Sequence, residues 1–176
     1  MSTSFKFSRK VLFGSLGIAL ITTSPMVQAA DANDPVYVHT NGANAFLESV
    51  VVVRPDEKVV FVNEDTDMHT ILGYHPETGK PDNTIAGKIN GTPGSSHPVS
   101  TYTVSIKKPG IYTYYCSMHA HLAPTYHGMV QPALNKGVDG YGGAMAGEII
   151  VTTDAALTAI NPPSSHTKIL KDYFGG

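Results

Sequence analysis

The chain has 176 residues, of which 12 are Lys or Arg and 14 are Asp or Glu, and its formal net charge is −2. This length suits one domain with a full core, and the acidic balance argues against nucleic acid or an anionic membrane surface as the main partner. A single cysteine excludes an internal disulfide and any binuclear metal centre that needs two bridging thiolates.

Residues 1–29 have the pattern of a secretory signal peptide. They carry three of the twelve basic residues and no acidic residue, continue through an apolar run at 11–21, and end in Val27-Gln28-Ala29. We expect cleavage after Ala29 or Ala30, a periplasmic or secreted protein, and no membrane insertion afterwards, because no later apolar run is long enough to span a bilayer. Removal of 29 residues would leave 147, with nine basic against fourteen acidic residues.

The remaining sequence predicts β-structure. Runs rich in β-branched and aromatic residues, or alternating in polarity between turns, are typical of short strands. They lie at 36–38, 46–53, 58–62, 69–72, 99–106, 111–116 and 147–152. Several short strands with no long helical period predict an all-β protein, a β-sandwich spanning residues 31–153.

Three segments depart from this pattern. Residues 75–98 are rich in Gly, Pro, Asn and Thr, which predicts a surface excursion with little regular structure. Residues 117–144 form a longer insertion, and a segment of that length either serves a function or contains a helix that the pattern does not reveal. The C-terminal tail, 154–176, is predicted to hold a short helix at 154–160.

The most informative motif runs from Gly110 to His119, GIYTYYCSMH, and places the only cysteine at the end of an aromatic strand, with a histidine three residues later. A lone cysteine is more often a small buried hydrophobe, but in an oxidising compartment it can also be held by a metal. This spacing is that of a copper–thiolate site. Such a site takes two imidazoles, one thiolate and a weak axial thioether, and the chain supplies each of these groups.

Two motifs together resemble the cupredoxin family, particularly its plastocyanin and pseudoazurin branch. They are Phe61-x-Asn63-x-Asp65-x-x-x-His69 and Gly110-x-Tyr112-x-Tyr114-Tyr115-Cys116-x-x-His119. The match covers most of residues 35–153. The resemblance implies a Greek-key β-sandwich and one type 1 copper ion, held by His69, Cys116 and His119. It also implies that Thr70 hydrogen-bonds to the cysteine loop.

The axial ligand and the second histidine have alternatives. Met145 matches the family pattern Met-x-Gly before a final strand, whereas Met129 lies nearer the cysteine but lacks the glycine; we favour Met145. Twenty-five residues separate His119 from Met145, many more than is usual in the family, although loop closure costs entropy only logarithmically with length. The insertion also contains His121, which is the alternative to His119.

The leading functional hypothesis is an exported mononuclear copper protein, not an enzyme, that carries single electrons between redox partner proteins. The alternative is copper delivery or storage, in which histidines and methionines of the insertion bind cuprous ions. An oxidase or nitrite reductase would need further copper ions, usually bound by several His-x-His pairs. The chain offers only one such pair, His119-Ala120-His121.

Overall fold

The computed structural model describes residues 34–41, 44–64, 66–91, 100–126, 128–133 and 144–159. The predicted signal peptide at 1–29 lies outside these ranges, as does the tail beyond residue 159. Within them, no helix combines the length and the apolar character needed to cross a membrane.

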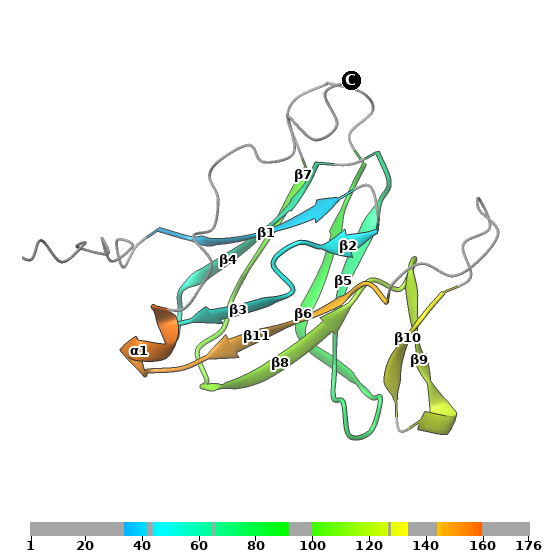
Figure 1. The fold of residues 1–176 in the computed structure, drawn as a ribbon. Coiled ribbons are helices and arrows are strands. Elements are labelled where there is room, and N and C mark those ends of the chain that lie inside the picture. The colour runs from blue at the N-terminus through cyan, green and yellow to red at the C-terminus, as the bar shows by residue number, and fades with distance from the viewer. Residues whose placement is uncertain are drawn as a thin grey trace, which may run out of the picture.

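Two sheets face each other in an all-β sandwich (Figure 1). The first sheet contains, in spatial order, β2 (Ala45–Phe46), β1 (Val36–Asn41), β4 (Lys58–Asn63) and β7 (Ser100–Ser105). The second contains β3 (Val50–Val53), β11 (Ala146–Val151), β8 (Gly110–Tyr115), β5 (His69–Tyr74) and β6 (Pro81–Ile89). Strand β1 pairs in parallel with β4, and β11 with β3, while the other pairs are antiparallel. The predicted all-β sandwich is confirmed.

An aromatic cluster joins the two sheets close to the end of β8. Phe46 and Phe61 come from the first sheet and Tyr114 from the second, and all three side chains are buried. The ring centroid of Tyr114 lies 5.0 Å from that of Phe46 and 5.1 Å from that of Phe61, both edge to face. Such pairs contribute about 0.5–1.5 kcal/mol each beyond the area they bury. The cluster therefore fixes β8 two residues before Cys116.

The expectation of little regular structure at 75–98 is wrong for residues 81–89, which form β6. Of the nine residues in this strand only Ile85 and Ile89 are buried. The apolar alternation that marks a strand in a sequence is therefore missing. The strand exists because it pairs with β5, with a shift of register between Leu72 and Gly73, and this pairing is not visible in local composition.

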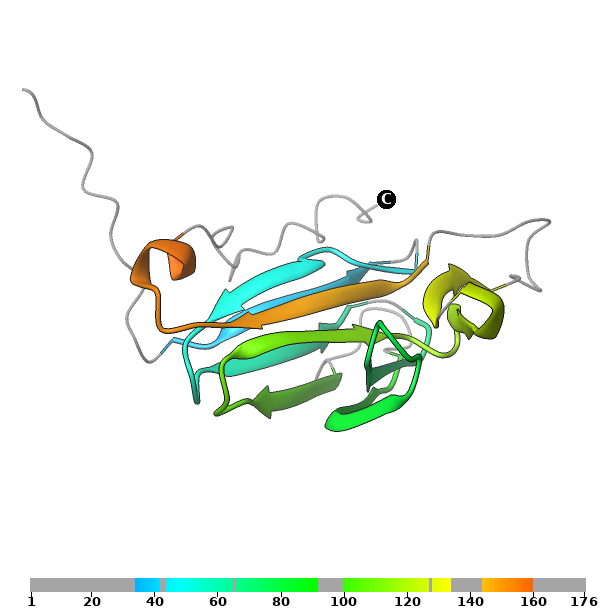
Figure 2. The same cartoon turned by 90° about the horizontal axis from the view of Figure 1, so that it is seen from below.

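The insertion at 117–144 contains a small hairpin in its described part. Strand β9 (Ala120–Ala123) pairs antiparallel with β10 (Met129–Pro132), and a single 3-10 turn, η1 (Pro124–Tyr126), lies between them. The hairpin and the short helix α1 (Ala155–Thr158) lie at opposite ends of the sandwich (Figure 2). The side chain of Asp154 caps α1 by accepting the N–H of Ala156 at 2.9 Å, so the short helix predicted at 154–160 is confirmed.

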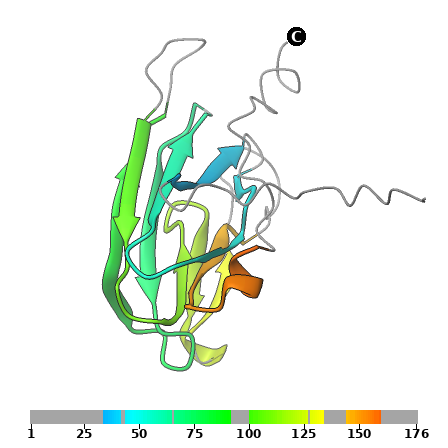
Figure 3. The ribbon, with the colours of Figure 1, turned by 90° about the vertical axis from the view of Figure 1, so that its left-hand side faces the viewer.

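Two glycines hold the hairpin against the body of the protein. Gly79, in the turn between β5 and β6, and Gly128, just before β10, face each other backbone to backbone, and Figure 3 shows this turn beside the hairpin. Their φ angles are +66° and +78°, a region that side chains disfavour. A Cβ on Gly79 would lie 2.8 Å from the Gly128 Cα. Any larger residue at either position would push the hairpin away.

Candidate metal centre

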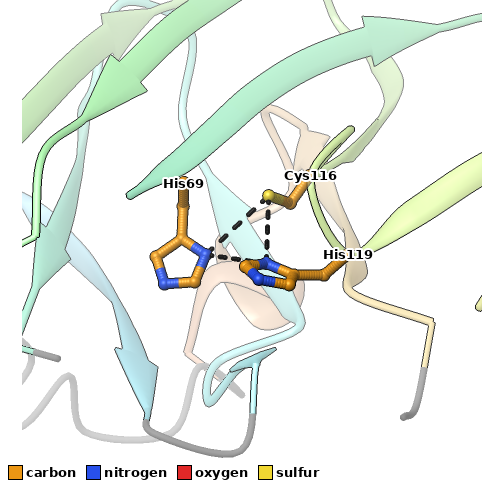
Figure 4. Close-up of side chains that lie close together, drawn as sticks. All are labelled: His69, Cys116 and His119. Atoms are coloured by element: carbon orange, nitrogen blue, oxygen red, sulfur yellow. Dashed lines mark hydrogen bonds between the residues drawn. The ribbon is translucent and has the colours of Figure 1, made fainter. Parts of the chain in front are cut away.

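Three side chains that are distant in sequence converge at one end of the second sheet (Figure 4). His69 is the first residue of β5, Cys116 directly follows β8, and His119 ends the turn before β9. The Cys116 Sγ lies 3.8 Å from the His69 Nδ1 and 3.5 Å from the His119 Nδ1, and the two Nδ1 atoms lie 3.2 Å apart. His69 and Cys116 are 0% exposed, whereas His119 is half-buried.

His69 is positioned by a buried asparagine at the end of β4. The Nδ2 of Asn63 donates to the carbonyls of Asp67 at 2.6 Å and Asn90 at 2.9 Å. Its Oδ1 accepts the hydroxyl of Thr40 at 2.7 Å. Because the loop from β4 to His69 is tied at Asp67, these bonds fix the direction in which the histidine enters the site. Sequence analysis missed this role of Asn63, although the residue is part of the quoted family motif.

Cys116 and His119 are positioned by a tight turn that joins β8 to the hairpin. The Cys116 N–H donates to the Met145 carbonyl at 2.9 Å, and the Cys116 carbonyl accepts the N–H groups of His119 at 3.2 Å and Ala120 at 2.8 Å. The His119 carbonyl in turn accepts the N–H of Ala133 at 3.0 Å. Backbone bonds therefore fix both residues, and they hold the start of β11 next to the cysteine.

Thr70 hydrogen-bonds to the cysteine loop, as predicted. Its backbone N–H points at the Cys116 Sγ at 3.4 Å, and its hydroxyl accepts the N–H of Ser117 at 2.8 Å. Burial alone would raise the pKa of the Cys116 thiol. Hydrogen bonds to the sulfur from His69 and from the N–H groups of Thr70 and Met118 outweigh burial, so the pKa is lowered from its ordinary value. The site thus favours a thiolate, the form that binds metals.

The chemistry of these donors fits a type 1 copper site. Two imidazole nitrogens and one sulfur face one another, and no acidic side chain belongs to the group. A thiolate and imidazoles suit copper, whereas a site for a hard cation would be built from oxygen ligands. His69, Cys116 and His119 are thus the residues that would hold the ion.

The alternative residues lie elsewhere. His121 is exposed on β9 and does not belong to the group of facing donors found among the described residues. Met129 is 58% exposed on β10, whereas Met145 is 0% exposed and its carbonyl bonds to Cys116.

Comparison with known proteins agrees with this arrangement. No protein-family model matches the chain. The chain is 29% identical to chloroplastic plastocyanin from Fritillaria agrestis over 119 residues, which are 68% of the chain and 72% of that protein. The match to plastocyanin and the group of two histidines and one cysteine make the chain similar to the cupredoxin family.

Among solved structures, the chain is similar to amicyanin from Paracoccus versutus, with 18% identity, a TM-score of 0.42, and coverage of 68% of the chain and 82% of amicyanin. It is also similar to a copper-containing nitrite reductase from Thermus scotoductus, with 23% identity and a TM-score of 0.42, covering 68% of the chain but 23% of the reductase.

Proposed function

We propose that this protein is a cupredoxin, an exported mononuclear type 1 copper protein that carries single electrons between redox partner proteins. The observation that carries the proposal is the convergence of the His69 and His119 Nδ1 atoms on the Cys116 sulfur. Copper held there would supply a centre that gains and loses one electron. The periplasmic or secreted location is part of the proposal and depends on the signal-peptide pattern at 1–29.

We assign His69, Cys116 and His119 as the ligands and Met145 as the axial thioether. The full burial of Met145 and the bond of its carbonyl to the Cys116 N–H support this assignment. Met129 is a poorer candidate because 58% of its surface is exposed on the hairpin.

The surroundings of the ligands favour electron transfer over chemistry on a substrate. Asn63 and Thr70 hold the two loops that carry the ligands, so the residues need to move little when the charge of the site changes. His119 is the one half-buried member of an otherwise buried group. Its ring edge is therefore the route by which an electron would reach a partner.

Two other functions have weaker support. Delivery or storage requires an ion that other molecules can reach, but His69 and Cys116 are 0% exposed. An oxidase or nitrite reductase requires further copper ions. Among the residues that the structure describes, His69, Cys116 and His119 are the one group of three or more His, Cys, Asp or Glu side chains that could hold a metal.

A copper titration tests the proposal. We expect the purified protein to bind one cupric ion tightly and to develop the intense charge-transfer absorption of a copper–thiolate bond, with the narrow hyperfine splitting of a type 1 site in its electron-spin-resonance spectrum. A protein that stays colourless with cupric ions, or that binds only cuprous ions, would contradict it.

The axial assignment predicts a change of reduction potential. Replacing Met145 by Leu removes a weak donor that stabilises the cupric form, so we expect a higher potential with copper retained. Voltammetry of the loaded protein measures this. Met129→Leu is the matched control and should leave the potential unchanged; the opposite pattern would make Met129 the axial ligand.

A further inference from the structure

The hairpin exposes a histidine and a methionine on the same face. In its register His121 lies opposite Gln131, and Met129 lies opposite Ala123. Since side chains alternate between the two faces of a strand, His121 and Met129 project from one face as diagonal neighbours. Diagonal neighbours on paired strands stand about 7–8 Å apart, within reach of long side chains.

Both side chains are open to solvent. His121 is exposed, and its ring makes no hydrogen bond or ion pair with any residue in the described ranges. Met129 is 58% exposed. An exposed thioether contributes little to packing, so the stability of the hairpin does not account for a methionine at this position.

The hairpin also fixes where these two side chains stand. At its base, the Ala120 N–H bonds to the Cys116 carbonyl at 2.8 Å. At its tip, Gly128 packs against Gly79 of the β5–β6 turn. These contacts therefore hold His121 and Met129 outside the primary centre. His121 is two residues after His119 in the chain.

An imidazole and a thioether are soft or borderline donors that suit a cuprous ion. We propose that His121 and Met129 form a second, exchangeable binding site for a cuprous ion on the exposed face of the hairpin. Two protein donors leave the ion open to a third ligand from solvent or from a molecule that carries copper. This site needs no occupancy of the primary centre and goes beyond the proposed electron carrier.

The test is an anaerobic titration of the full protein with cuprous ions against a coloured cuprous chelator. We expect His121→Ala and Met129→Leu each to bind one equivalent fewer than the wild type. Two matched controls should keep the wild-type number. Gln131→Ala changes the residue opposite His121, and Met118→Leu removes another exposed methionine, which is 51% exposed but lies in the turn after Cys116.

Methyl resonances of isotopically labelled methionines locate the ion. The Met129 methyl signal should shift with the additional equivalent, while that of Met118 should not. Equal binding by the wild type and both site variants would overturn the proposal, and so would an equal loss in Gln131→Ala. The cupric charge-transfer absorption is recorded on the same samples. If the wild type lacked this absorption, the proposed function would be contradicted. The difference in the number of bound cuprous ions between the wild type and the two site variants would still test the second site.

Discussion

Replacing Cys116 by Ser is expected to abolish the charge-transfer absorption of the copper-loaded protein while the β-sandwich remains folded. The band arises from electron transfer between the sulfur and the cupric ion, and a hydroxyl cannot supply it. The serine oxygen would also be a poorer ligand for copper in either oxidation state. Burying a hydroxyl in place of the 0% exposed sulfur should cost about 1–3 kcal/mol of folding free energy.

Visible absorption and circular dichroism measured on the same samples separate the two effects. Ser117→Ala is the matched control at the adjacent, exposed position, and it should retain the band. If the colour persists in Cys116→Ser, the thiolate is not its source and the assigned copper centre is wrong. If the variant is colourless because it is unfolded, the far-ultraviolet spectrum will show the loss of β-structure.

The central group of the site could be predicted from sequence because its members occur in two short motifs. His69 follows an acidic turn, and Cys116 and His119 are separated by two residues, so the resemblance locates all three. Thr70 was predicted in the same way. The bonds from Asn63 to Asp67 and Asn90 could not be predicted, because the three residues meet only after β4, β5 and β6 have assembled.

The strands were predictable where burial imposes a pattern. In β7 the exposed Thr101, Thr103 and Ser105 alternate with the less exposed Tyr102 and Val104, and the sequence shows the alternation. The hairpin and β6 were missed for different reasons. Strand β6 buries only two residues, while β9 and β10 have four residues each and contain or adjoin proline. The hairpin is defined by the pairing of β9 with β10, and β6 by its pairing with β5, and composition reveals neither pairing.

The structure explains why the Met-x-Gly pattern has a glycine at position 147, which the sequence alone does not show. A Cβ on Gly147 would collide with the Tyr114 hydroxyl and would lie 2.6 Å from the Ser49 carbonyl oxygen. Gly147 pairs with Tyr114 across β11 and β8, two residues after Met145. The close approach therefore holds the start of β11 against β8, where the Met145 carbonyl bonds to Cys116.

We accordingly expect Gly147→Ala to destabilise the fold by about 1–3 kcal/mol, the usual cost of overpacking. The added methyl must move either β11 or the buried Tyr114 ring, so the charge-transfer absorption of the copper-loaded variant should shift as well. Urea unfolding and visible spectra measure the two effects. Gly110→Ala is the matched control, because it lies in the same pair of strands and its Cβ would lie 3.4 Å from the Tyr112 ring, an ordinary contact.

Tyr114→Phe identifies the colliding atom. The Tyr114 hydroxyl is fully buried and has no hydrogen-bond partner among the described residues, so its removal alone should change stability little or raise it. In the Gly147→Ala background the same change removes one of three close contacts, that with the hydroxyl, and the double variant should recover part of the lost stability. Because the Ser49 carbonyl oxygen and the ring carbon Cζ, which phenylalanine retains, would each still lie 2.6 Å from the added Cβ, recovery should be incomplete. Strictly additive effects would show that the Ser49 carbonyl and the aromatic ring, and not the Tyr114 hydroxyl, make glycine necessary at this position.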